Sequence, residues 1–327
     1  ASILREFRDP IVEQDDLIAA LMQEKRAAYV TFHQSYTYED LIEGLRPAVQ
    51  DGVIQYNIED GIFKQLALDA WRSYLWQEQT EEGVIPKTRD DARTAPQYFL
   101  VIDELNRGNV SKIFGELITL LEPSKRLGME EQMIVTLPLS KEPFGVPANL
   151  HVIATMNTAD RSIATLDIAL RRRFRFEERM PDASVLENTL AASKVKEKVI
   201  ALFNVLNQRI EFLIDRDHML GHAIFMGVVS YSDLREVMRY NVIPLLQEYF
   251  YGEWDKIALV LGHDPGAAFG ILKQHRLDRD ALFPTAKDAV LEAARVRYEI
   301  DYAFLTAREE ELAPYFDQVL GTGVGSP

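Results

Sequence analysis

Residues 98–102 (YFLVI) form a run in which every side chain is apolar, and two adjacent carboxylates, Asp103 and Glu104, follow it directly. A strand that is apolar on both faces is typical of a parallel sheet covered by helices on both sides. A second such run, residues 150–156 (LHVIATM), ends just before Asn157. Ligands of open α/β sheets bind beyond the carboxyl ends of the strands. The two runs therefore favour an α/β fold with a polar site at one edge of its sheet.

The rest of the first 180 residues alternates between strand and helix patterns. A short apolar run favours a strand, and apolar residues at helical spacing favour an amphipathic helix. The further elements that we predict are strands over 28–32 and 174–176, a helix that stops at Pro47, helices over 60–75, 111–122 (with Ser111 as N-cap) and 166–173, and a hairpin within 133–146.

The pattern changes at Pro181, because residues 185–214 and 234–250 favour long helices with no strand between them. Strands that alternate with helices, followed by helices alone, predict an α/β domain and then a helical one. The remainder is less regular and contains one helix pattern, over 286–298. The predicted division is a large α/β subdomain over 1–180, a helical lid over 181–261 and a C-terminal extension over 262–327.

Composition excludes several classes of function. The chain has no Cys, so disulfides and cysteine-based metal sites or nucleophiles are ruled out. Its formal net charge is −15, which disfavours sequence-specific DNA binding by this chain alone, because the DNA backbone demands Lys and Arg. No apolar stretch is as long as a membrane span and no signal peptide opens the chain. We expect a cytoplasmic protein without a membrane partner.

The carboxylates after the first apolar run are candidates for metal and water chemistry. One can hold a hydrated Mg²⁺, a hard cation that prefers oxygen ligands, and the other can orient or deprotonate an attacking water. If the two strands are neighbours, Asn157 lies beside Asp103 and Glu104 and could hold a water or a phosphate oxygen without adding charge. Each feature also has an ordinary structural explanation: a polar pair that ends a strand, and an Asn in a turn.

Three consecutive arginines, residues 171–173, stand out in an acidic chain. Phosphoryl transfer builds negative charge, and an arginine from a neighbouring subunit can stabilise that charge. The alternative is a solvated basic helix end that complements the helix dipole. For the arginines in isolation, this alternative is the better interpretation.

Taken together and in this order, these features make the chain resemble the McrB family, the AAA+ motor subunits of modification-dependent restriction systems. The matching stretches are VTFHQSYTYEDLIEGLRP (30–47), VIDELNRGNVSKIFGELITLLE (101–122), VPANLHVIATMNTADRSIATLDIALRRRF (146–174) and, more weakly, LGHAIFM (220–226). The resemblance implies an AAA+ P-loop NTPase-like parallel sheet with helices on both faces, incomplete at the N-terminus, followed by an α-helical lid.

The resemblance also implies a role for each candidate residue. Asp103 and Glu104 match the Walker B pair, Asp103 holding Mg²⁺ through water and Glu104 acting in catalysis. Asn157 matches sensor I. Arg172 matches the trans-acting arginine finger, with Arg173 beside it. The positions implied to bind the nucleotide cofactor are Asp103, Asp160 and Arg161 of the NTADR signature, and His222 in the second-sensor region.

By the same resemblance the protein is an NTPase that uses Mg²⁺ and GTP or ATP. It would assemble with copies of itself into a ring, as a hexamer, and drive a McrC-type nuclease on DNA that other domains or the partner contact. The sequence departs from the family in one respect, since it contains no GxxxxGK[ST]. That loop cradles the phosphates, so we expect it to lie upstream and these residues alone to be inactive. A non-catalytic AAA+-like assembly module and a MoxR-like chaperone motor are the alternatives.

Overall fold

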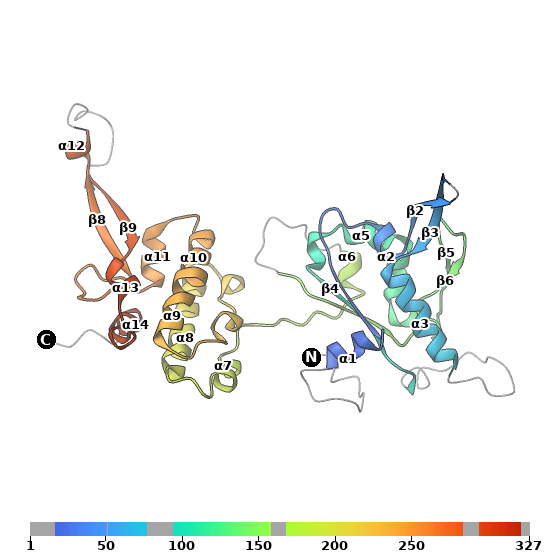
Figure 1. Ribbon diagram of the computed structural model, residues 1–327, viewed down its shortest axis with the longest axis horizontal. Helices are drawn as coiled ribbons and strands as arrows, with labels where there is room; N and C mark the ends of the chain where they lie inside the picture. The colour runs from blue at the N-terminus through green and yellow to red at the C-terminus, as the bar shows by residue number, and fades with distance from the viewer. Residues whose placement is uncertain (1–16, 51, 77–93, 158–167, 284–293, 322–327) are drawn as a thin grey trace. The chain divides into compact units, whose positions relative to one another are not determined.

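The computed structural model describes residues 17–50, 52–76, 94–157, 168–283 and 294–321. The chain divides into two compact units, residues 1–177 and 178–327, and each is described by itself (Figure 1). Within the described residues, no helix combines the length and the apolar character needed to cross a membrane.

The first unit is built on a parallel sheet of three strands in the order β1–β4–β7, which are Ala27–Thr31, Tyr98–Asp103 and Leu150–Ala154. All three were predicted from their apolar runs. The register places Thr31 opposite Asp103 and Ala154 opposite Ile102. The carboxyl ends of the three strands therefore meet at one edge of the sheet, the edge at which the polar residues were expected.

Helices cover both faces of this sheet. Alternate residues of a strand point to opposite faces. Leu100 and Ile102 share a buried core with the helices α3 (Ile62–Trp76) and α5 (Val110–Phe114). Phe99 points the other way and packs against Leu21 of α1 (Leu17–Gln23). The first unit is thus an α/β structure with a helix-flanked parallel sheet, which confirms the predicted fold class.

Four local predictions for this unit are wrong, and three of them concern residues 109–176. Asn109, and not Ser111, caps α5, because its side chain accepts a hydrogen bond from the Lys112 backbone N–H. The predicted helix over 111–122 stops at Gly115, whose φ of 54° ends α5, and continues as the 3-10 helix η3 (Gly115–Leu121). Residues 174–176 form no strand. The predicted hairpin is confirmed, as β5 (Val135–Thr136) pairs antiparallel with β6 (Pro143–Phe144).

An antiparallel ribbon of β2 (Glu43–Gln50) and β3 (Val53–Asp60) was not predicted. It follows the short helix α2 (Tyr38–Leu41), so Pro47 lies inside a strand and does not end a helix. This strand has a neighbour on one side only, where a proline is tolerated. The sequence Asp51-Gly52 between two apolar segments was the available signal, since Asp-Gly favours a two-residue hairpin turn.

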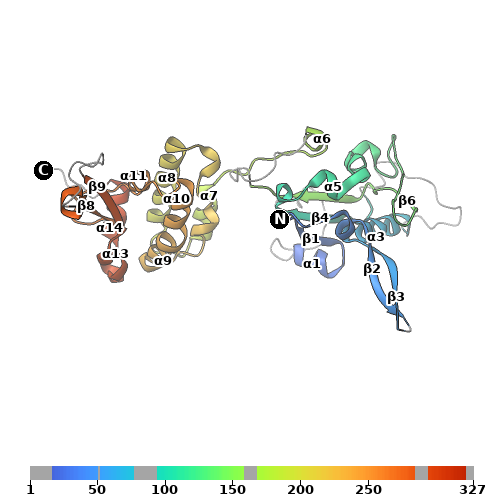
Figure 2. The same cartoon turned by 90° about the horizontal axis from the view of Figure 1, so that it is seen from above.

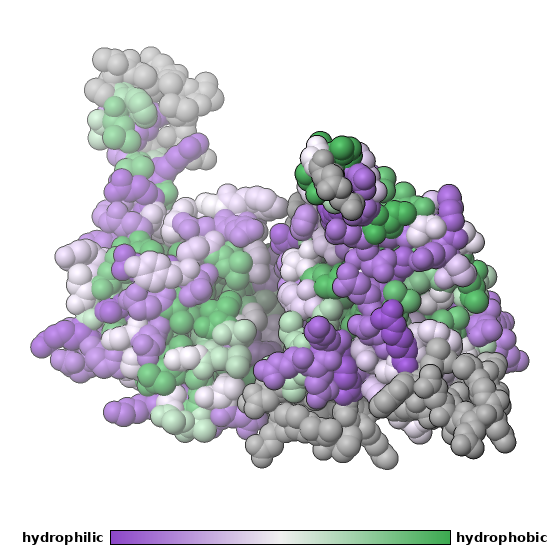
Figure 3. All heavy atoms as spheres, turned by 45° about the vertical axis from the view of Figure 1, so that its right-hand side comes forward, coloured by the Kyte–Doolittle hydropathy of each residue, from purple (hydrophilic) through white to green (hydrophobic). Residues whose placement is uncertain are grey.

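The β2–β3 ribbon is amphipathic and its apolar face is exposed. Its register aligns Leu45 with Ile58, Pro47 with Tyr56, and Val49 with Ile54 on one face. Val49 is 75% exposed and Tyr56 68% exposed. Figure 2 shows the ribbon projecting away from the sheet, and Figure 3 shows apolar side chains on the projecting end.

A buried ion-pair network holds the base of this ribbon. Lys64 of α3 lies 3.1 Å from the Glu43 carboxylate, and both side chains are almost fully buried. The same ammonium pairs with Asp60 and Glu142. The second oxygen of Glu43 accepts hydrogen bonds from the backbone N–H groups of residues 139 and 140. Since every buried charge here has partners, ion pairs and hydrogen bonds connect the base of the ribbon to α3 and to the loop before β6.

The second unit starts with helices and continues with a β-ribbon. Its elements are α7 (Ala183–Thr189), α8 (Lys196–Leu213), η5 (Arg216–His218), η6 (His222–Phe225), α9 (Tyr231–Val237), the π-helix η7 (Met238–Val242), α10 (Ile243–Tyr249), α11 (Trp254–Val260), β8 (Leu272–Asp278), α12 (Arg279–Leu282), β9 (Ala294–Ile300), α13 (Tyr302–Thr306), η8 (Glu309–Glu311) and α14 (Ala313–Leu320). The helical region predicted after Pro181 is confirmed, although the first long helix is split into α7 and α8.

The helix predicted over 286–298 is wrong in its described part. Residues 294–300 form β9, which pairs antiparallel with β8. The physical reason is an alternation with period two, in which Val296 and Tyr298 stand on one face and Arg295 and Arg297 on the other. One hydrophobic core joins the lid helices to the segment after residue 262. The three-part division of the chain stays a prediction.

Candidate functional site

Asp103 is held by both neighbouring strands at the carboxyl edge of the sheet. The Tyr29 hydroxyl of β1 donates to Asp103 Oδ2 at 2.6 Å, and the Thr155 hydroxyl, just after β7, donates to Oδ1. The Glu104 backbone N–H donates to the same Oδ1 at 3.1 Å. These hydrogen bonds, first from Thr155 and then from Tyr29, lower the pKa of Asp103 below its usual value. The carboxylate is therefore ionised at neutral pH and fixed in direction.

Glu104 has a left-handed backbone, with φ 54° and ψ 47°, which is uncommon for a residue other than glycine. Hydrogen bonds on both sides impose it, since the Asp103 carbonyl accepts from the Phe32 N–H and the Leu105 N–H donates to the Thr155 carbonyl. The Glu104 carboxylate lies 3.1 Å from Arg107 Nε. Strained backbone of this kind concentrates at functional sites.

Asn157 lies close to the loop that follows β4. Its backbone carbonyl accepts a hydrogen bond from Asn106 Nδ2 at 3.0 Å, and its side chain is exposed. Together with the Thr155–Asp103 hydrogen bond, this contact ties the segment after β7 to the segment after β4. The structure therefore brings Asp103, Glu104 and Asn157 to one edge of the sheet, as the sequence predicted.

The arginine run, residues 171–173, begins with the last residue of α6 (Ile168–Arg171). The surroundings of the three arginines differ. Leu170 is buried in the core of the first unit, which fixes the run on that unit. Arg173 pairs with Glu122 at 3.0 Å and is largely buried. Arg171 lies over the Phe176 ring. Arg172 is exposed, and no ion pair to it is found in the described part of the chain. Of the three arginines, Arg172 is the exposed one with neither an ion pair nor a ring contact among the described residues.

The remaining predicted positions are less informative. Asp160 and Arg161 lie outside the described residues. His222 belongs to the second unit, where its Nδ1 accepts a hydrogen bond from the backbone N–H of Asp182, the N-cap of α7. That contact is structural, and it assigns no role in nucleotide binding to His222.

The carboxyl edge fits a magnesium ion that is held mainly by its own waters and by phosphate. Within the described residues, no group of three or more His, Cys, Asp or Glu side chains could cage a metal. Mg²⁺ does not need such a cage, because it keeps several waters and binds through one or two carboxylates and phosphate oxygens. The ionised, directed carboxylate of Asp103 is a ligand of this kind.

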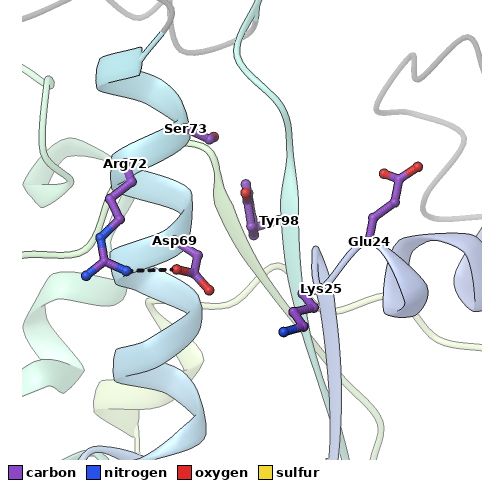
Figure 4. A pocket seen from close by; sticks show the side chains of 6 residues that line it. All are labelled: Glu24, Lys25, Asp69, Arg72, Ser73 and Tyr98. Carbon is purple, nitrogen blue, oxygen red and sulfur yellow. Dashed lines mark hydrogen bonds and ion pairs between the residues drawn. The ribbon is translucent and has the colours of Figure 1, made fainter.

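A shallow hollow of about 410 Å³ lies at the opposite end of the sheet. Figure 4 shows its lining, in which Tyr98 is the first residue of β4 and Asp69 pairs with Arg72 on α3. Because parallel strands carry their ligands at the carboxyl ends, this hollow is not the candidate site.

Sequence reasoning missed Tyr29 and Thr155. Both are polar residues at or near the end of a strand of the sheet, and that position was the only available signal. Their partnership with Asp103 depends on the register of strands that are more than 50 residues apart in sequence, which the residue pattern does not reveal.

Comparisons with known proteins agree with this geometry. The family model "AAA domain (dynein-related subfamily)" matches residues 15–174, and "McrB, alpha-helical lid domain" matches residues 198–258. The first match contains the sheet and its carboxyl edge, and the second covers most of α8 through α11.

Two curated relatives are similar to this chain. The Type IV methyl-directed restriction enzyme EcoKMcrB subunit of Escherichia coli K12 is 36% identical over 247 residues, which are 70% of this chain and 48% of that protein. The Type II restriction enzyme BsuMI component YdiS of Bacillus subtilis strain 168 is 26% identical over 216 residues, which are 59% of this chain and 61% of the relative. The chain thus spans about half to three fifths of the length of these relatives.

Proposed function

The chain belongs to the McrB-type family of AAA+ proteins, and from this premise we propose that it supplies the nucleotide-hydrolysing part of a restriction-system motor. The observation that carries the proposal is the convergence of Asp103, Glu104 and Asn157 at the carboxyl edge of one parallel sheet. Both relatives are named as parts of restriction enzymes, which supports the setting.

The proposed chemistry divides the work among these side chains. Mg²⁺, when bound, would neutralise phosphate charge. Asp103 would hold it through a water, since its carboxylate is ionised and fixed in direction. Glu104 would orient and deprotonate the attacking water. The Asn157 amide would hold that water or a phosphate oxygen by hydrogen bonds without adding charge. Asp160, Arg161 and His222 stay proposed nucleotide contacts.

The phosphate-binding loop is the part that these residues do not contain. No GxxxxGK[ST] occurs in the 327 residues, and the loop's N–H groups and Lys are what hold a triphosphate. We therefore expect turnover only when such a loop precedes them. The nucleotide of this proposal is GTP or ATP.

The assembly is proposed from the exposed arginine and from the family. Arg172 is exposed, and we infer that it reaches a neighbouring copy. A ring of copies, with six as the expected number, would then complete each site with a finger from the next subunit. A McrC-like nuclease is the proposed partner, DNA would be contacted through it or through other domains, and a cytoplasmic location stays a prediction.

The Glu104→Gln variant, made in a protein that carries the loop ahead of these residues, tests the proposed function. It keeps shape and hydrogen bonding but removes the base, so nucleotide should still bind while turnover of GTP or ATP falls on the order of a hundredfold. Phosphate release and calorimetric binding measure the two properties. Glu130→Gln, an exposed carboxyl away from the site, is the control and should change neither.

Three outcomes would contradict the proposal. Near-normal turnover by Glu104→Gln would mean that the water is activated elsewhere. Nucleotide binding or ring formation with no turnover in the unmodified protein would favour the non-catalytic assembly module. Turnover that drives a protein substrate, with no dependence on a nuclease partner, would favour the chaperone motor.

A further inference from the structure

We propose that Tyr29 and Thr155 are positioning residues that leave the Asp103 carboxylate one acceptor direction, and that this direction receives a water of the bound Mg²⁺. The inference rests on the proposed function and goes beyond it, because it assigns a role to two side chains, one on β1 and one just after β7, the strands on either side of β4.

The three strands bring these groups together in register. Thr31 of β1 lies opposite Asp103. Ala154, the last residue of β7, lies opposite Ile102, so Thr155 follows beside Asp103 on the other side. Tyr29 stands two residues before Thr31 and therefore on the same face of β1, from which its ring reaches along the strand to Asp103 Oδ2. One carboxylate thus joins all three strands.

The hydrogen bonds to Asp103 use most of its capacity. An ionised carboxylate has about four acceptor sites on its two oxygens. Tyr29 occupies one on Oδ2, while Thr155 and the Glu104 N–H occupy two on Oδ1. About one site remains, on Oδ2. A hydrated Mg²⁺ presents its waters as hydrogen-bond donors. The one remaining acceptor site on Oδ2 can accept a hydrogen bond from one such water.

The two hydroxyls also fix the carboxylate in the way that outer partners orient a metal ligand. Without them only the Glu104 backbone N–H would hold the carboxylate, so its second oxygen would offer lone pairs in several directions. Removing outer partners of metal ligands costs about 10–100-fold in metal affinity. The Asp103 carboxylate is ionised at neutral pH with or without the two hydroxyls. The loss of Mg²⁺ affinity would therefore come from its orientation and not from its charge.

The first test needs no nucleotide and uses this chain as it is. The urea midpoint is measured for Tyr29→Phe, Asp103→Asn and the double variant, and likewise for Thr155→Val with Asp103→Asn. If the hydroxyls bind the carboxylate, each single hydroxyl removal lowers the midpoint, and the same removal has a smaller effect once Asp103 is Asn. Equal effects in both backgrounds would show that no such hydrogen bonds exist and would overturn the proposal.

The second test measures Mg²⁺ affinity in the protein that carries the phosphate-binding loop. Binding of a fluorescent GTP or ATP analogue is titrated with Mg²⁺. Tyr29→Phe and Thr155→Val should raise the half-saturating Mg²⁺ concentration about tenfold or more, with nucleotide binding in EDTA unchanged. Thr155→Ser keeps the hydroxyl and should stay near the unmodified value. Tyr38→Phe, which removes a hydroxyl–carboxylate hydrogen bond to Glu116, is the matched control.

The outcomes separate this inference from the function on which it rests. If the unmodified protein shows no Mg²⁺-dependent nucleotide binding, the proposed function fails and the inference fails with it. If the unmodified protein shows that dependence and the Tyr29 and Thr155 variants share its Mg²⁺ requirement, the function stands and the positioning role is overturned.

Discussion

At the scale of single residues, the arginine run is the clearest case in which structure refines the sequence. The sequence treats Arg172 and Arg173 as near equivalents. The structure separates them, because Arg173 pairs with Glu122 in its own unit while Arg172 is exposed. A side chain that already has an ion-pair partner in cis is the poorer candidate for a group that acts on another subunit. We therefore assign the finger to Arg172 as a proposal.

Mixed assemblies test this assignment. In the protein with its phosphate-binding loop, Arg172→Ala and Glu104→Gln subunits should each be nearly inactive, since an arginine finger contributes about 10³–10⁵ in rate. Mixed in one ring, some interfaces would pair an intact Glu104 with an intact Arg172 from the neighbour, and part of the turnover should return. Turnover is measured across mixing ratios.

The matched variant is Arg173→Ala. It should lower stability by breaking the pair with Glu122, and it should not show complementation with Glu104→Gln if its role is in cis. A flat, inactive profile for the Arg172 mixtures, with both variants confirmed in the same ring, would count against the trans assignment.

His151 gives the first unit a dependence on pH. Burial, together with the nearby Arg126 guanidinium, lowers the pKa of His151 to about 4, while an unfolded histidine titrates near 6.5. Between these two values His151 is protonated in the unfolded chain and neutral in the folded chain. The free energy of unfolding therefore falls as pH decreases from about 6.5 toward 4. His151→Gln should reduce that fall by about 3 kcal/mol at most.

Urea unfolding at pH 7, 5.5 and 4.5 measures the effect of His151→Gln. His33→Gln, at an exposed position, is the control and should leave the acid dependence as it is. The same slope with pH in His151→Gln as in the unmodified chain would show that His151 does not cause it.

At the scale of elements, the sequence predicted the strands of the parallel sheet and failed for the β2–β3 ribbon, for β9 and for the end of α5. The sheet strands were found because all-apolar runs need no knowledge of their neighbours. The β2–β3 ribbon was missed because one of its faces is as apolar as a core face although its side chains are exposed. The break of α5 at Gly115 was missed because its left-handed backbone is a property of the fold. The carboxylates and Asn157 of the candidate site were predicted from their positions at strand ends. The hydroxyl donors to Asp103 were not, because their positions depend on the register of the strands.

The base of the β2–β3 ribbon should be sensitive to the loss of one charge. Burial alone would raise the pKa of Glu43, but hydrogen bonds from residues 139 and 140 and from Lys64 outweigh it, so the carboxylate is charged and fully buried. Lys64→Met leaves that charge without its ammonium and should cost about 3–5 kcal/mol in the free energy of unfolding. Circular dichroism in urea measures it.

The companion variant distinguishes loss of the ion pair from loss of packing. Adding Glu43→Gln to Lys64→Met removes the unpaired charge and should recover part of the lost stability. A double variant no more stable than Lys64→Met, or a single variant as stable as the unmodified chain, would show that the buried pair does not control the ribbon.

At the scale of the whole molecule, the chain consists of two units with separate cores. The core of the second unit is drawn entirely from residues 183–320, and the first unit's core from residues 28–174. The core of the second unit combines lid helices with α13 and α14, since Phe304 and Phe316 are fully buried in it. The C-terminal segment therefore stabilises the lid.

Residues 178–327 should fold when expressed alone. A unit with its own core needs no template, and its helical circular dichroism should be lost in one cooperative urea transition. A fragment that begins at residue 205, inside α8, lacks Val199, Leu202 and Phe203 and serves as the control that should not fold cooperatively. A non-cooperative 178–327 fragment would mean that the first unit is required.

The left-handed backbone of Glu104 has a consequence for how such a chain can change over generations. A residue other than glycine held in this conformation costs about 1–3 kcal/mol, so glycine at position 104 would make the fold more stable. Selection for stability alone would therefore drive the carboxylate out of this position, and only selection for what the carboxylate does would retain it. A library of this chain screened by protease resistance, with no demand on activity, should enrich glycine at position 104. Under selection for stability alone, Glu104, which is central to the proposed chemistry, would be among the first residues to be replaced.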